Sequence, residues 1–191
     1  PNEKAPFQGF YRELSRSIQK QQFTYDPNTA HLTKVEDQPV TVSFATALFG
    51  TRTISNHTGT AIISQDVFGT VTETRITTTY LSPILTKNRP LADTVTTNSI
   101  TFGFDQSETH SRQIQKFTYN ANTTHLTGVT DLPIPALDPL TFAGQTISGQ
   151  SGSGIISRDA FGTVTLTTIT TEYLGLTLDS NADRIPDAHN R

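Results

Sequence analysis

The chain has 191 residues, a net charge of −3 and a pI of about 5.9, so it lacks the basic surface typical of nucleic-acid binding. It contains no cysteine, which excludes disulfides, thiolate metal sites and a catalytic thiol. Its apolar runs are far shorter than the roughly 18 residues that a membrane-spanning helix needs. It also contains no methionine, so we expect a processed or excised piece of a longer product. About 35 residues are threonine, which is β-branched and favours strands.

Two stretches of the chain each occur twice. FTYDPNTAHLTKV at 23–35 returns at 117–129 with nine of 13 positions identical, and 59–81 returns at 152–174 with 16 of 23 identical. The offsets of about 94 and 93 residues match a small domain and are too long for a solenoid. The sequence therefore predicts a first unit at 1–90, a second unit at 91–176 and a tail at 177–191.

Each unit is expected to consist of β-strands. Segment 11–22 has little helical spacing, and its counterpart in the second unit has none, so we interpret it as strand or loop. Proline-rich stretches at 82–93 and 131–139 read as the link between the units and an internal loop. Six or seven strands per unit predict an all-β protein of two tandem β-sandwich (Ig-like) units. The strands expected in the first unit are, in chain order, 21–26, 31–35, 41–49, 61–64 and 70–81.

A short loop in the last hairpin of each unit reads DVFG or DAFG. We expect its aspartate to accept hydrogen bonds from turn amides, because no second acid nearby would complete a catalytic pair. Its glycine should take a conformation open mainly to glycine, and its phenylalanine is expected to pack inward. The residues are Asp66, Phe68 and Gly69 in the first unit and Asp159, Phe161 and Gly162 in the second.

The first repeated stretch places an aromatic residue, a tyrosine, an acid or amide and a leucine in a fixed order. The pattern resembles the YD repeat of Rhs-type and teneurin-like surface proteins over about 13 residues per unit. The glycine of that family is absent, and its units recur at shorter intervals. We interpret the stretch as a hairpin with an aromatic strand, a polar turn and an apolar return strand. The matching residues are Phe23, Tyr25, Asp26 and Leu32, and more loosely Phe117, Tyr119, Asn120 and Leu126.

The tail DSNADRIPDAHN carries oxygen-bearing side chains at alternating positions. It resembles the calcium repeat of thrombospondin type 3 modules, which implies that Ca²⁺ is bound in a tight loop of oxygen ligands. The family's glycine is Arg184 here, so we expect weak binding. The alternative is a solvated acidic terminus. The implied ligands are the side chains of Asp179, Asn181, Asp183 and Asp187 and the carbonyl of Ile185, with Asn190 at the last position of the pattern.

Three further features carry expectations of their own. Threonines alternate at 70–74 and 163–167, as on ice-binding surfaces, but each unit offers one row, so we interpret both as exposed strand faces. His31 and His125 are repeated beside leucine, and we expect structural roles for them. Asn56 and Asn122 fit the N-glycosylation pattern and are expected in exposed loops.

These observations favour a secreted or cell-surface, non-catalytic structural or adhesive protein. Its expected partners are other subunits or neighbouring domains of the same parent protein, not nucleic acid or membrane. One alternative is a subunit of a surface filament, in which Pro1 to about Gln22 completes a neighbour's sheet. Another is a carbohydrate-binding module of a larger secreted enzyme, which the absence of tryptophan disfavours. The sequence has no phosphate loop and no nucleophile elbow, so we expect no enzyme activity.

Overall fold

The computed structural model describes residues 14–46, 48–82, 89–171 and 173. These residues form strands and no helix, which confirms the all-β prediction, and among them no helix could span a membrane. The strands are β1 (Leu14–Ile18), β2 (Gln21–Tyr25), β3 (Leu32–Asp37), β4 (Pro39–Thr46), β5 (Gly50–Thr58), β6 (Thr60–Gln65), β7 (Val71–Tyr80), β8 (Ala92–Phe102), β9 (Glu108–Tyr119), β10 (Leu126–Asp131), β11 (Leu140–Phe142), β12 (Gln145–Ile147), β13 (Ser153–Arg158) and β14 (Val164–Ile169).

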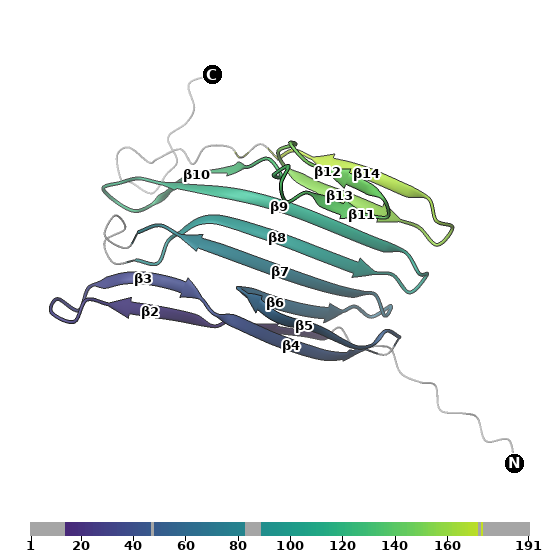
Figure 1. Cartoon of the computed structure of the whole chain (residues 1–191), viewed down its shortest axis with the longest axis horizontal. Helices are drawn as coiled ribbons and strands as arrows, with labels where there is room; N and C mark the ends of the chain where they lie inside the picture. Colours follow the sequence, from purple (N-terminus) through teal and green to yellow (C-terminus); the bar gives the residue numbers. More distant parts are fainter. Residues whose placement is uncertain (1–13, 47, 83–88, 172, 174–191) are drawn as a thin grey trace, which may run out of the picture.

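One large sheet runs through both units in the order β1-β6-β7-β8-β9-β13-β14, with β10 paired to the second part of β9. Figure 1 shows its strands from β6 to β14. Every pair in it is antiparallel. The hairpins β2–β3, β4–β5 and β11–β12 form separate two-stranded sheets. Because β8 pairs with β7 on one side and with β9 on the other, the units meet edge to edge. Two separate Ig-like sandwiches are therefore not confirmed.

The sequence repeat is also a repeat of strand register. The pairing of β6 with β7 recurs between β13 and β14 at an offset of 93 residues, and that of β2 with β3 recurs between β9 and β10 at 94. The first part of β9 is the counterpart of β1. Strand β8 has no counterpart among the described residues of the first unit. Matched pairs are Thr60–Ile76 with Ser153–Ile169, and Gln21–Asp37 with Gln115–Asp131.

A short hairpin covers the same face of the large sheet in each unit. Alternation along β6 turns Ala61 and Ile63 toward the β4–β5 hairpin, whose Val42 and Ile54 are fully buried against them. In the second unit, the β11–β12 hairpin and the preceding loop cover Ile156 of β13. The second core consists of Ile134, Leu140, Ile147 and Ile156. We call this face the covered face. The opposite face, the open face, is not covered by the β4–β5 or the β11–β12 hairpin.

The loops of the predicted hairpins follow their local chemistry. Oδ1 of Asp66 accepts hydrogen bonds from the amides of Phe68 and Thr70 at 2.9 Å, and Asp159 makes the equivalent bonds. The glycine that follows has φ of 88° in both units, as expected. The prediction that the phenylalanines pack inward is wrong, since Phe68 is 72% and Phe161 is 96% exposed. The aspartate folds the loop backbone around its own carboxylate, and the ring is left outside.

The first repeated stretch is a hairpin in both units, as predicted. Oδ1 of Asp26 accepts bonds from two loop amides at 2.8 Å, and the amide oxygen of Asn120 does the same at 2.9 Å. Residues 14–22, which we interpreted as strand or loop, form β1 and the start of β2 and pair within their own unit. The resemblance to the YD repeat stays a prediction.

Candidate functional site

The face of the large sheet that the hairpins leave open carries a row of hydroxyl groups. Following the register from strand to strand, each of the seven strands contributes one serine or threonine at the same level. The five inner residues are half-buried between their neighbours, and the two at the ends are exposed. In spatial order the first row is Ser15, Ser64, Thr72, Thr101, Thr109, Ser157 and Thr165.

A second row lies two residues further along each strand. It contains five hydroxyls and two isoleucines, and it holds no charged residue. Oγ1 of Thr72 lies 3.1 Å from Oγ1 of Thr101 in the first row, and Oγ1 of Thr74 lies 3.0 Å from Oγ of Ser99 in the second. The second row is Ser17, Ile62, Thr74, Ser99, Ser111, Ile155 and Thr167.

The two rows form a regular polar lattice. Neighbouring strands lie about 4.8 Å apart, and alternate residues of one strand lie about 6.7 Å apart. A hydroxyl both donates and accepts hydrogen bonds, and a threonine adds a methyl group beside it. Neither row contains a base or a carboxylate that could activate a nucleophile. The two rows thus present hydrogen-bonding groups at regular intervals and contain no group for acid–base catalysis.

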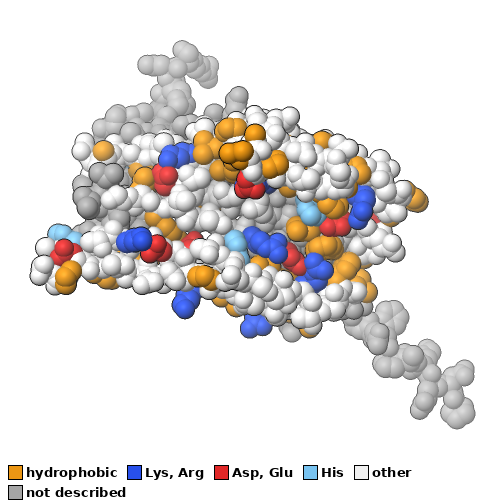
Figure 2. All heavy atoms as spheres, in the orientation of Figure 1, with side chains coloured by type: hydrophobic (Ala, Val, Ile, Leu, Met, Phe, Trp, Pro, Cys, Tyr) orange, Lys and Arg blue, Asp and Glu red, His pale blue; other side chains and the backbone are white. Residues whose placement is uncertain are grey.

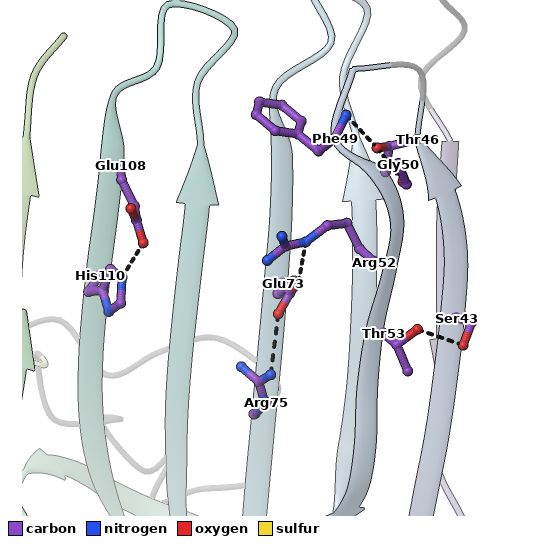
Figure 3. Close-up of polar contacts among 10 residues, drawn as sticks. All are labelled: Ser43, Thr46, Phe49, Gly50, Arg52, Thr53, Glu73, Arg75, Glu108 and His110. Atoms are coloured by element: carbon purple, nitrogen blue, oxygen red, sulfur yellow. Dashed lines mark hydrogen bonds and ion pairs between the residues drawn. The ribbon is translucent and has the colours of Figure 1, made fainter.

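The covered face has charged side chains along its middle, between the two cores (Figure 2). Glu73 on β7 is 3% exposed, and both its oxygens are engaged: Arg52 Nε donates to Oε1 at 2.7 Å and Arg75 Nη2 to Oε2 at 3.2 Å (Figure 3). The guanidinium of Arg52 also lies 4.1 Å from the ring centre of Phe102 on β8. This carboxylate is neutralised by its neighbours and serves as a structural ion pair.

A second charged group lies two strands away. Nε2 of His110 lies 2.8 Å from Oε1 of Glu108, and Nη2 of Arg158 donates to Oε2 at 3.2 Å. The ring of His110 stacks on Phe142 at 3.9 Å. Strand β8 lies between His110 and Glu73, so their backbone positions are roughly 10 Å apart. Each side chain bonds a different partner: Glu73 bonds the two arginines, and His110 bonds Glu108. The described residues contain no cluster of three potential metal-ligating side chains.

Each unit also holds a buried aspartate that joins a hairpin to the end of a strand. Oδ1 of Asp37 accepts bonds from Tyr80 Oη at 3.1 Å, Gln21 Nε2 at 3.2 Å and Gln19 Nε2 at 3.4 Å. Oδ2 is buried and accepts no bond from the described residues. Burial, followed by the charge of Asp37, raises the pKa of Tyr80. We call this group the latch, because it ties β3 to β7.

The latch of the second unit has the same parts. Tyr173 Oη donates to Oδ1 of Asp131 at 3.3 Å, Gln113 Nε2 donates to the same oxygen at 3.1 Å, and Gln115 bonds the tyrosine. A hollow of about 410 Å³ beside it is lined partly by Asp131, Thr170 and Tyr173. Since both units build the latch from equivalent residues, it is a feature of the repeated fold and not of one ligand site.

The structure places the sequence-predicted residues as follows. The tail ligands Asp179, Asn181, Asp183, Ile185, Asp187 and Asn190 lie outside the described residues, so the calcium site stays a prediction. His31 and His125 are exposed in hairpin loops. Asn122 is exposed in a loop as expected, whereas Asn56 is exposed within β5, at a register shift, and not in a loop.

Sequence reasoning missed both the latch and the width of the hydroxyl array. A signal for the latch exists, because an aspartate stands two residues before a proline in both units, at Asp37 and Asp131. For the array, the alternating threonines at 70–74 and 163–167 indicated one row per unit but not the width, which depends on how many strands join one sheet. No family model matches the chain, no curated protein matches its sequence, and no solved structure matches its fold.

Proposed function

We propose that this is a non-catalytic, extracellular structural or adhesive protein whose open sheet face binds a solid, hydroxyl-rich polymer such as a crystalline polysaccharide. The observation that carries the proposal is the first hydroxyl row, which runs across seven strands without interruption. A row of this kind has a fixed repeat along one direction, and a polymer surface of repeating hydroxyls can meet many of its groups at once. Individually weak contacts then add up over a large area.

The absence of catalysis in this proposal rests on the charged groups of the covered face. Glu73 is paired with two arginines, and Glu108 with a histidine and an arginine, and we interpret both groups as structural ion pairs. A carbohydrate-binding module of a larger secreted enzyme would use the same open face. That alternative differs from ours only in what the parent protein contains. The tail would add a weak calcium site.

Adsorption to insoluble polysaccharide tests the proposal. Purified protein is mixed with microcrystalline cellulose or chitin, and the fraction that leaves solution is measured. Thr72→Val together with Thr101→Val removes two central hydroxyls and keeps the β-branched shape. Thr96→Val is the matched control, because Thr96 lies on the same strand as Thr101 but on the covered face.

We expect the wild type and the Thr96→Val control to adsorb equally, and the double variant to lose most of its binding. Circular dichroism of all three proteins checks that the sheet is intact. Two results would contradict the proposal: a wild type that stays in solution with both polymers, or a double variant that adsorbs like the control.

A further inference from the structure

Strand β14 forms an edge of the large sheet, although its counterpart in the first unit lies inside it. Among the described residues β14 pairs with β13 alone, whereas β7 pairs with β6 and also with β8 along its whole length. The two strands share most of their sequence and have the same register to their preceding strand. The backbone edge that accepts β8 on β7 is therefore present and unoccupied by described residues on β14.

The side chains of β14 suit pairing with another strand. Leu166 and Ile169 are 45% and 48% exposed, and β14 contains no charged residue and no proline. Proteins usually protect an edge strand from pairing with charged residues, proline or a bulge. Strand β14 has none of these, since its register with β13 is also regular. At the position of Leu166, β7 carries Glu73, which is buried and ion-paired. The edge strand β14 thus exposes a leucine at the position where the inner strand β7 has a buried, ion-paired glutamate.

The opposite edge, β1, is less suited to self-pairing. Its Leu14 is 48% exposed, but Arg16 occupies the middle of this five-residue strand. Two copies of β1 paired antiparallel would bring two arginines close together, and like charges across a strand pair are destabilising. A charge at this place also protects an edge from association.

Strand direction decides which edge β14 can meet. Both β7 and β9 run antiparallel to β8, so they are parallel to each other, and so are their counterparts β14 and β1. Copies stacked in one orientation would therefore pair β14 with β1 in parallel, unlike any pair in this sheet. A two-fold axis perpendicular to the sheet instead pairs β14 with β14 antiparallel and keeps both covered faces on one side.

We propose that the chain forms a dimer in which β14 pairs antiparallel with β14 of a second copy, near Leu166. The dimer has one continuous sheet and closes its most apolar edge. The hydroxyl rows of the two copies, which end at Thr165 and Thr167, then meet at the axis, so the open face doubles in width. This inference is independent of the proposed function, since a monomer could also adsorb to a polymer.

Charge substitution at the axis tests the dimer. Leu166→Lys and Leu166→Asp each place like charges opposite one another, and Leu14→Lys is the matched control on the other edge. Sedimentation of the full chain over a concentration series measures the oligomeric state, and circular dichroism confirms that each variant is folded. We expect a dimer for the wild type and for Leu14→Lys, and monomers for both Leu166 variants. An equal mixture of the two Leu166 variants should recover the dimer, because lysine then faces aspartate across the axis.

Several results would overturn the proposal. A wild type that is still monomeric at roughly 1 mM has no meaningful self-affinity. Species larger than a dimer, or loss of the dimer in Leu14→Lys, would show that β1 takes part. If the mixture of the two folded Leu166 variants stays monomeric, β14 does not pair with β14 of a second molecule.

Discussion

Removing the Tyr80 hydroxyl should destabilise the protein measurably. Tyr80→Phe keeps the ring and deletes one of the three donors to Oδ1 of Asp37, a residue that is 9% exposed. Hydrogen bonds to charged groups contribute about 1.5–3 kcal/mol. Gln19 and Gln21 still donate to Asp37, although Gln21 loses the Tyr80 hydroxyl as a second acceptor, so we expect the lower part of that range. For a chain of this length each kcal/mol lowers Tm by about 2–4 °C, which makes the expected shift about 3–6 °C.

The second unit supplies the matched comparison. Tyr173 makes the same bond to Asp131 but is 38% exposed, so water can replace its hydroxyl when Tyr173→Phe removes it. We therefore expect less than half the destabilisation of Tyr80→Phe. Thermal melting followed by circular dichroism, with guanidinium unfolding as a second measurement, gives both values. If Tyr80→Phe melts like the wild type, or if Tyr173→Phe costs as much as Tyr80→Phe, the latch does not hold the hairpin in the way described.

Three further predictions concern the core, the hairpin loop and the tail. Ile156→Ala should lower the free energy of unfolding by about 2–5 kcal/mol, whereas Phe161→Ala should change it by less than about 0.5 kcal/mol, as guanidinium unfolding will show. The hydrogen bond that the Thr163 amide donates to Oδ1 of Asp159 holds the pKa of that carboxyl below its ordinary value. The contribution of Asp159 to stability is therefore present above about pH 4 and is lost as pH falls through the folded value. Asp159→Asn should thus flatten the dependence of Tm on pH in the acid range; an unchanged profile contradicts this. Asp183→Ala should abolish calcium heat in isothermal titration, where we expect a Kd of about 10⁻⁴–10⁻³ M for the wild type, and leave the melt unchanged.

The hairpins were predictable because their signals are local. Alternating threonines, a turn built around an aspartate and a glycine with positive φ lie within about 15 residues of one another in each unit. The error at Phe68 and Phe161 is also local in origin. A rule that places large apolar residues inside is a statistical tendency, whereas the direction of a turn side chain follows from the backbone that the aspartate fixes.

The single large sheet was not predictable from the same signals. A repeat of about 94 residues suggests two separate domains, and nothing in the composition of β8 shows that it pairs on both sides. The feature that indicates the single sheet is that β8, a strand of the second unit, has no counterpart among the described residues of the first. A strand that bridges the two units is needed only once. The hydroxyl array depends on this bridge. Without β8, the rows would break between Thr72 and Thr109.

Differences between the two units are more informative about function than their identities. Identical positions, such as the glycines and aspartates of the hairpin loops, preserve what every copy of the fold needs. Glu73 and Leu166 occupy the same place on equivalent strands, yet one is enclosed by two arginines and the other is 45% exposed. A leucine in the inner position would leave Arg52 and Arg75 without their carboxylate, and a glutamate at the outer edge would repel a second copy. The difference between Glu73 and Leu166 therefore follows from the different neighbours of the two strands. The neighbour of β7 is another strand of the same chain, and the neighbour that we propose for β14 is a second molecule.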